Sequence, residues 1–224
     1  FWPAKRSGTN DVGIFRGEDD KLPYNTFHFL RQQMIKEPAL PNLCLADFIA
    51  PQEKTVSDFL GGFVVTAGIG EEALSKEYEK ENDDYHALLV KALADRLAEA
   101  FAEHMHERVR KEYWGYCTEE SFNNEELISE NYQGIRPAPG YPACPDHSEK
   151  ETLFSLLEPE KSIGVSLTES YAMRPAASVS GLYFSHPESR YFSVGKISES
   201  QVDDLALRKS VSKEKLAKLL SQNL

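Results

Sequence analysis

The chain has 224 residues, with 25 Lys and Arg against 36 Asp and Glu, so its formal net charge at pH 7 is −11. Because 41% of the residues are hydrophobic and 27% are charged, the composition predicts a globular protein with a sizeable core and excludes disorder as the main state. An acidic balance without a Lys/Arg-rich stripe argues against nucleic acid as a partner, since phosphate contacts supply most of such affinity.

The first third of the chain predicts strands. Residues 12–15 and 24–29 alternate apolar and polar side chains around a polar stretch, which indicates an antiparallel hairpin. A short apolar run at 43–48 and a longer one at 59–66 predict two further strands. Residues 60–70 are the longest weakly polar run, far shorter than the ~20 residues that span a bilayer, so no membrane partner is expected.

The middle of the chain predicts helices. A helical pattern covers residues 71–112 with a break at 82–84, where short acidic side chains make good N-caps. In its second half, apolar residues recur every fourth position, at Leu89, Leu93, Leu97, Phe101 and Met105. This stripe predicts a long central helix whose apolar face is directed at the core.

The rest of the chain mixes helices and strands. Helices are expected at 123–132, 152–157, 201–209 and 213–220, and strands at 179–184 and 191–197. The hairpin-like connections favour antiparallel pairing. The predicted fold class is α+β, a single domain with a mainly antiparallel twisted sheet, a long central helix and further helices packed around it.

Motifs for self-contained catalysis are weak. Residues 68–73 fit a dinucleotide-binding glycine pattern, but Glu71 and Glu72 stand where a pyrophosphate would lie, so a tight turn is favoured. Cys144 and His147 have the spacing of half a metal site without a second pair nearby. We therefore predict no catalytic and no metal-ligating residues. Three cysteines, an odd number, fit a reducing cytoplasm.

The segment 136–147 reads R-P-A-P-G-Y-P-A-C-P-D-H. Its prolines fix φ in advance and leave backbone carbonyls free, so a ligand can be bound with little ordering cost. Gly140 permits close approach, Arg136 can grip a carboxylate in two-pronged fashion, and Tyr141 offers an aromatic face and a hydroxyl. The residues alone leave two interpretations open. One is a site for a small zwitterionic ligand, and the other is a rigid wrap over the core with Arg136 paired to an acid such as Glu130.

This segment also resembles the signature of the activation domain of cobalamin-dependent methionine synthase. The likeness extends over nearly the whole chain, at Phe1–Ala4, Cys44–Phe48, Val90–Arg110, Tyr113–Tyr116 and Ser178–Pro187. The resemblance implies a domain that binds S-adenosylmethionine and supports the reductive methylation of cob(II)alamin. That reaction reactivates an enzyme which passes a methyl group from methyltetrahydrofolate to homocysteine.

The resemblance further implies which residues surround the ligand. They are Arg136 at the carboxylate, Ala138, Gly140 and Tyr141 along the adenosyl side, Tyr191 and Phe192 as the opposite wall, and the acids Glu130 and Glu99 nearby. An acid that meets the ligand's ammonium group in the family lies upstream of Phe1. We therefore expect residues 1–224 to be an N-terminally truncated fragment of a larger multidomain chain, inactive on its own.

The resemblance implies cofactors and partners outside this chain. Cobalamin would be bound by another domain of the same polypeptide, and zinc would occur only in the homocysteine domain of the full enzyme. The expected partners are that cobalamin-binding domain and flavodoxin or another electron donor, which would dock on a basic patch of Arg108, Arg110 and Lys111. The alternative interpretation is a non-catalytic docking module in which the proline-rich segment is architectural and no adenosyl ligand binds.

Overall fold

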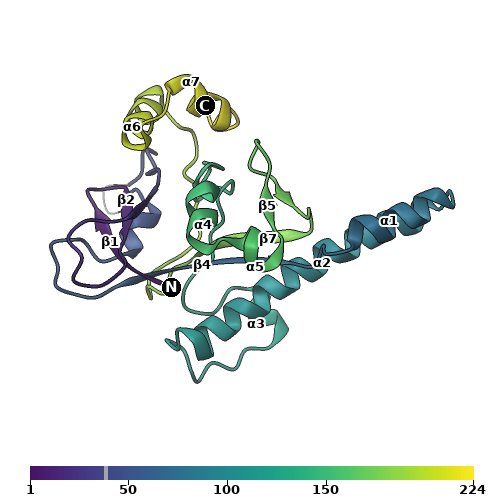
Figure 1. The fold of residues 1–224 in the computed structure, drawn as a ribbon. Coiled ribbons are helices and arrows are strands. Elements are labelled where there is room, and N and C mark those ends of the chain that lie inside the picture. Colours follow the sequence, from purple (N-terminus) through teal and green to yellow (C-terminus); the bar gives the residue numbers. More distant parts are fainter. Residues whose placement is uncertain (38–39) are drawn as a thin grey trace. The chain divides into compact units, whose positions relative to one another are not determined.

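The computed structural model describes residues 1–37 and 40–224, which form two compact units. The first unit comprises residues 1–62, 133–152 and 182–224, and the second comprises residues 63–132 and 153–181. Figure 1 labels their helices and strands.

A three-stranded antiparallel meander opens the first unit. It consists of β1 (Trp2–Ser7), β2 (Asp11–Ile14) and β3 (Asn25–His28). In the β2–β3 pair Val12 lies opposite Phe27, and both side chains are fully buried. The hairpin predicted from the alternating sequence is confirmed.

Two further strands complete the main sheet. They are β4 (Phe59–Thr66) and β7 (Ser178–Tyr183), and the strand order is β3-β2-β1-β4-β7. A separate antiparallel pair joins β5 (Ser166–Leu167) to β6 (Met173–Arg174). β1 pairs antiparallel with both β2 and β4, and β2 pairs antiparallel with β3. The predicted α+β class with a mainly antiparallel sheet is confirmed.

The strand predicted at 43–48 is wrong. Leu45–Phe48 forms the short 3-10 helix η1. Its turn is held by Asp47, whose Oδ2 accepts a hydrogen bond from the Cys44 N–H at 2.9 Å. Arg31 donates two hydrogen bonds to the same carboxylate, at 2.6 and 2.7 Å. An acidic side chain that bonds its own backbone competes with an extended conformation.

The strand predicted at 191–197 is also wrong. This segment has no strand in the structure, although its apolar side chains are partly or fully buried. Its backbone bonds the proline-rich segment instead, because the Val194 N–H donates to the Pro142 carbonyl at 2.8 Å. The segment is therefore apolar because its side chains are buried, although it pairs with no strand.

The C-terminal helices of the first unit form a small core of their own. They are α6 (Glu199–Lys209) and α7 (Lys213–Leu219), shown in yellow in Figure 1. Their buried apolar side chains cluster with Leu30, Val194 and Ile197. Both helices agree with the predicted ranges to within two residues. α4 (Glu149–Leu157) begins in this unit and continues into the second.

The second unit is mainly helical. Its helices are α1 (Glu71–Lys80), α2 (Asp84–Arg108), the π-helical turn η2 (Val109–Tyr113), α3 (Asn124–Ile128) and α5 (Pro159–Ile163). The predicted break between α1 and α2 is confirmed, because Asp83 caps α2 by accepting a hydrogen bond from the His86 N–H at 3.1 Å. α3 is shorter than the helix expected at 123–132.

The orientation predicted for α2 is wrong. The side chains that it buries are Ala87, Ala94, Ala98, Ala102 and His106. The leucine stripe that was expected to face the core is exposed, with Leu97 at 62% of its maximal accessibility. Close packing on the buried side requires small residues, so the helix turns its alanines inward.

Candidate functional site

The proline-rich segment of the first unit folds into a tight, irregular loop. The Gly140 N–H donates to the Cys144 carbonyl at 2.7 Å, and the Cys144 N–H donates to the Tyr141 carbonyl at 2.9 Å. The Tyr141 N–H in turn donates to the Ala138 carbonyl at 3.2 Å. These bonds fix the loop before any ligand arrives, which reduces the entropy lost on binding.

Glycine is required at the apex of this loop. Gly140 has φ of 99°, in the region that side chains other than glycine rarely adopt. A Cβ atom built there would lie 2.1 Å from Cε1 of His147, so the imidazole ring lies directly against the glycine backbone. The close contact between the backbone at residue 140 and the His147 ring is therefore possible only for glycine.

Several main-chain groups of the loop are available to a ligand. Among the described residues, those without a hydrogen-bond partner include the Ala138 N–H and the Gly140 carbonyl. The neighbouring Pro137 carbonyl is already used, because it accepts from the Leu182 N–H at 2.9 Å. One free donor and one free acceptor two residues apart suit the edge of a heterocyclic base, which offers both kinds of group.

Tyr191 lies beside the backbone of Arg136, and Tyr141 follows Arg136 in the same loop. The Arg136 N–H donates to the Tyr191 hydroxyl at 3.0 Å, which joins two segments 55 residues apart. Tyr141 is 61% exposed and Tyr191 is 38% exposed. Both rings are therefore accessible from solvent.

The remaining predicted site residues, Phe192, Glu130 and Glu99, lie outside the proline-rich loop. Phe192 is half-buried, and its ring packs against Phe48 with 6.4 Å between ring centroids. It also packs against the core of α6 and α7. Glu130 and Glu99 belong to the second unit. There Glu99 lines a hollow of about 450 Å³ together with Asp95 and Ser178. The roles of Phe192, Glu130 and Glu99 toward a ligand stay predictions.

His147 is a feature of the loop that the sequence interpretation missed. The sequence indicates only half a metal site at Cys144 and His147 and predicts no role for the imidazole in the loop. Burial lowers the pKa of His147, and the nearby Lys150 charge lowers it further. Lys150 Nζ lies 3.2 Å from His147 Nδ1. The imidazole is therefore held in its neutral form against Gly140 at neutral pH.

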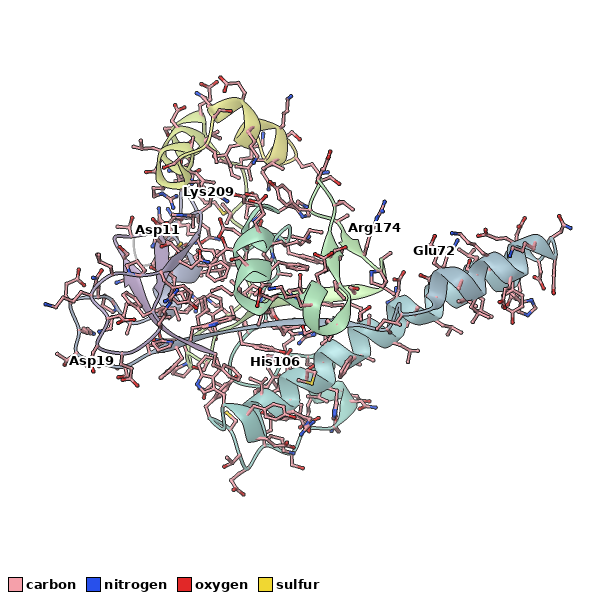
Figure 2. The ribbon with its side chains drawn as sticks, in the orientation of Figure 1. Asp11, Asp19, Glu72, His106, Arg174 and Lys209 are labelled. Atoms are coloured by element: carbon pink, nitrogen blue, oxygen red, sulfur yellow. The ribbon has the colours of Figure 1, made fainter. Side chains whose placement is uncertain are left out.

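A buried charge cluster supports the C-terminal end of the loop. Lys209, labelled in Figure 2, donates from Nζ to Asp146 Oδ2 at 2.6 Å, Ser148 Oγ at 2.7 Å and Glu149 Oε1 at 2.6 Å. Asp146 and Glu149 are almost fully buried. Burial raises the pKa of Glu149, while Lys209 opposes that shift. The cluster ties α6 to the end of the loop and was not visible in the sequence, because its members lie about 60 residues apart.

The expected basic patch at the end of α2 is not present. Arg110 is fully buried, with Nη2 at 2.7 Å from Glu120 Oε1. Arg108 pairs with Glu112 at 2.7 Å, and Lys111 lies 3.5 Å from Glu107. Each expected cation is neutralised by an acid, so these residues form no patch of positive charge.

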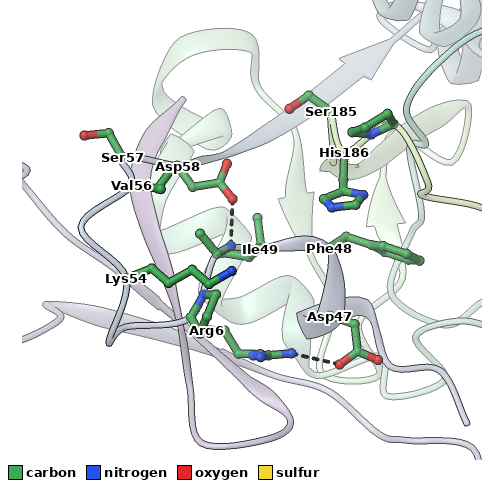
Figure 3. Close-up of a pocket in the computed structure, with 13 residues that line it drawn as sticks. Arg6, Asp47, Phe48, Ile49, Lys54, Val56, Ser57, Asp58, Ser185 and His186 are labelled. Atoms are coloured by element: carbon green, nitrogen blue, oxygen red, sulfur yellow. Dashed lines mark hydrogen bonds and ion pairs between the residues drawn. The ribbon is translucent and has the colours of Figure 1, made fainter. Parts of the chain in front are cut away.

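Figure 3 shows another hollow, which lies in the first unit. It has a volume of about 610 Å³ and is lined by residues 47–51, among others. Its charged groups are largely committed, since Arg6 Nη1 lies 3.1 Å from Asp47 Oδ1 and Asp58 Oδ2 accepts from the Ala50 N–H at 2.7 Å. This hollow therefore presents less free polar chemistry than the loop does.

The fold and the loop together define a class of protein. It is an α+β module with a preorganised proline-rich loop that presents main-chain groups, an arginine and an exposed tyrosine as a candidate site. Within the described residues, no group of three or more His, Cys, Asp or Glu could hold a metal ion. None of the helices in the described part of the chain is both long and apolar enough to cross a membrane.

Comparison with known proteins identifies the family. The family model described as "Vitamin B12 dependent methionine synthase, activation domain" matches residues 1–210. A solved structure, the crystal structure of the MetH reactivation domain bound to AdoHcy, is 55% identical with a TM-score of 0.96. The match covers 100% of this chain and 68% of that one. The chain thus belongs to the family of vitamin B12-dependent methionine synthase activation domains, as its resemblance predicted.

Proposed function

We propose that the loop 136–147 binds S-adenosylmethionine and that this chain uses the ligand to reactivate cobalamin-dependent methionine synthase. The observation that carries this proposal is the preorganised loop, with its free Ala138 N–H and Gly140 carbonyl beside Arg136. Family membership supports the same role, and the similar MetH reactivation domain was crystallised with AdoHcy.

Each group of the loop has a separate task in this proposal. The Arg136 guanidinium binds the ligand carboxylate, and the main chain at Ala138 and Gly140 recognises the adenine edge. Tyr141 and Tyr191 cover the adenosyl group and exclude water. Phe192 supports that wall from the core, and Glu130 and Glu99 supply negative charge for the ligand's cationic part.

The contribution to the reaction is positioning. S-adenosylmethionine supplies the methyl group for the reductive methylation of cobalamin, which another domain of the same polypeptide holds. Placing an activated methyl group near its acceptor requires neither a protein nucleophile nor a general base. The full enzyme is a methyltransferase from methyltetrahydrofolate to homocysteine, and its zinc belongs to the homocysteine domain. Flavodoxin or another electron donor supplies the electron in the cytoplasm, and this chain alone produces no turnover.

Calorimetric titration with S-adenosylmethionine tests the proposal. The wild-type chain should bind, and Arg136→Ala should weaken binding by about 10- to 100-fold, since a charge-assisted hydrogen bond contributes about 1.5–3 kcal/mol. Arg16→Ala, a matched change at an exposed arginine of the first unit, should bind like the wild type. Equal affinity of Arg136→Ala and wild type would remove Arg136 from the site.

The docking-module alternative predicts a different result. Under that alternative the wild-type chain shows no heat of binding with S-adenosylmethionine at millimolar concentration. A cobalamin domain would still be captured by the Arg136→Ala variant. This combination would contradict the proposed ligand site.

A further inference from the structure

The apex of the proline-rich loop packs on the side chain of His147. A Cβ atom built on Gly140 would lie 2.1 Å from Cε1, 2.4 Å from Nδ1 and 2.7 Å from Nε2 of this histidine. An approach along the ring plane at Cε1 would leave both nitrogens much farther away than Cε1. The three similar distances therefore mean that the imidazole ring lies face-on against the Gly140 backbone.

The start of α4 holds the ring in this position. The Lys150 N–H donates to the His147 carbonyl at 3.2 Å, and Lys150 Nζ lies 3.2 Å from His147 Nδ1. Because an ammonium group has donors only, Nδ1 is the acceptor and Nε2 carries the proton of the neutral ring. The neighbouring carboxylate of Asp146 is committed to Ser148 and Lys209. The ring is thus oriented before any ligand arrives.

The backbone against this ring carries one of the groups assigned to the ligand. The Gly140 N–H is bonded to the Cys144 carbonyl, whereas the Gly140 carbonyl has no partner among the described residues. A glycine has no side chain to restrict rotation of its peptide groups, and a ring packed flat on its Cα removes that freedom. We propose that His147 is a positioning residue of the S-adenosylmethionine site, which fixes the direction of the free Gly140 carbonyl. This role depends on the proposed function of the loop.

Protonation of His147 would oppose this arrangement. Among the described residues, the charged groups that act on the ring are Lys150 and Asp146. An imidazolium would direct a proton on Nδ1 at the Lys150 ammonium group, 3.2 Å away. Burial, followed by the Lys150 charge, lowers the pKa of His147 below its ordinary value of 6.5. Affinity for the ligand should therefore be constant near neutral pH and fall as the pH drops through that lowered pKa.

Calorimetric titration of the 224-residue chain with S-adenosylmethionine at several pH values tests this role. His147→Ala should weaken binding by about 10-fold at neutral pH, because the Gly140 peptide regains its freedom. His147→Gln retains a planar group that accepts from Lys150 but does not titrate, so it should restore the affinity to within about threefold of wild type. Toward acid pH the wild type should lose affinity, and His147→Gln should not.

His28→Gln is the matched control, since His28 is a half-buried histidine of β3 whose Nδ1 lies 3.1 Å from Asp11 Oδ1. It should keep the affinity and the pH profile of the wild type. A purely structural role would lower the thermal midpoint of His147→Ala and leave the affinity of the folded protein unchanged, which would overturn the positioning role.

Two further outcomes separate the positioning role from the proposed function. Parallel pH profiles of the wild type and His147→Gln would overturn the positioning role alone, and this comparison decides even if His147→Ala does not fold. A wild-type chain that binds no S-adenosylmethionine at any pH would overturn the proposed function, and the positioning role with it.

Discussion

The proline-rich loop of the first unit and α2 of the second unit differ in where their small and large side chains lie. In the loop, Gly140 is enclosed by its own neighbours, and His147 leaves no room for a side chain. In α2, the large side chains Leu93 and Leu97 point to solvent, while alanines face the interior.

This difference separates a preorganised loop from an exposed helix surface. The loop has its hydrogen bonds made and its shape fixed in isolation, as a binding site for a small ligand requires. The leucine stripe of α2, by contrast, leaves large apolar side chains exposed to solvent. Substitutions should therefore be costly around the loop and nearly neutral on the exposed side of α2.

The largest effect is expected from the cation beneath the loop. Lys209→Met leaves Asp146 and Glu149 buried without their partner, which should lower the free energy of unfolding by about 3–5 kcal/mol. Urea unfolding measures the change. Lys213→Met, which removes an exposed ion pair to Asp203 on the adjoining helices, should cost no more than about 1 kcal/mol. Similar losses for both variants would contradict the role of the buried cluster.

The next effect concerns the glycine of the loop. Gly140→Ala introduces both a strained backbone and a contact with His147, and should cost about 2–4 kcal/mol. Gly70→Ala is the matched control, because Gly70 has φ of 83° with nothing within 4 Å of the added Cβ. It should lose only the backbone component, about 1 kcal/mol. Equal losses in urea unfolding would mean that the loop relaxes without resistance.

A smaller effect should appear at alkaline pH. Burial lowers the pKa of Lys209, but the charges of Glu149 and Asp146 outweigh it, so the pKa lies above its ordinary value of 10.5. The stabilisation from such a cation is complete below the unfolded pKa and is lost as pH rises through the folded pKa. Above pH 10.5 the wild-type chain should therefore lose stability more steeply than Lys209→Met. Parallel pH profiles of the two proteins would argue against this linkage.

The smallest effect is expected on the exposed leucine stripe of α2. Leu97→Ala in the 224-residue chain should change the free energy of unfolding by no more than about 0.5 kcal/mol, because its side chain is exposed. Leu205→Ala in α6, where the side chain is fully buried, should cost about 2–5 kcal/mol. A comparable loss at Leu97 would show that the stripe is part of the core after all.

The elements that could be predicted from the sequence are those fixed by local chemistry. The start of α2 follows from the Asp83 cap, and the start of α7 follows from Ser212, which accepts from the Lys215 N–H at 3.2 Å. The β2–β3 hairpin follows from alternation around a polar loop. In each of these cases, neighbouring residues carry the information.

The features that could not be predicted depend on distant residues. The apolar periodicity of α2 predicts a buried leucine stripe, but the packing of distant elements buries the alanines of the helix and leaves the leucines exposed. The run at 191–197 is apolar because it bonds Pro142 and packs on the C-terminal helices, although no strand lies beside it. The Lys209 cluster likewise joins residues that no local pattern connects.

The central claim is that the loop 136–147 recognises S-adenosylmethionine through its main chain and Arg136. A crystal structure of this chain with S-adenosylhomocysteine tests it most directly. The account predicts the ligand within hydrogen-bond distance of the Ala138 N–H and the Gly140 carbonyl, with its carboxylate on Arg136. A ligand bound elsewhere, or a loop that stays empty at saturating ligand, would contradict the account.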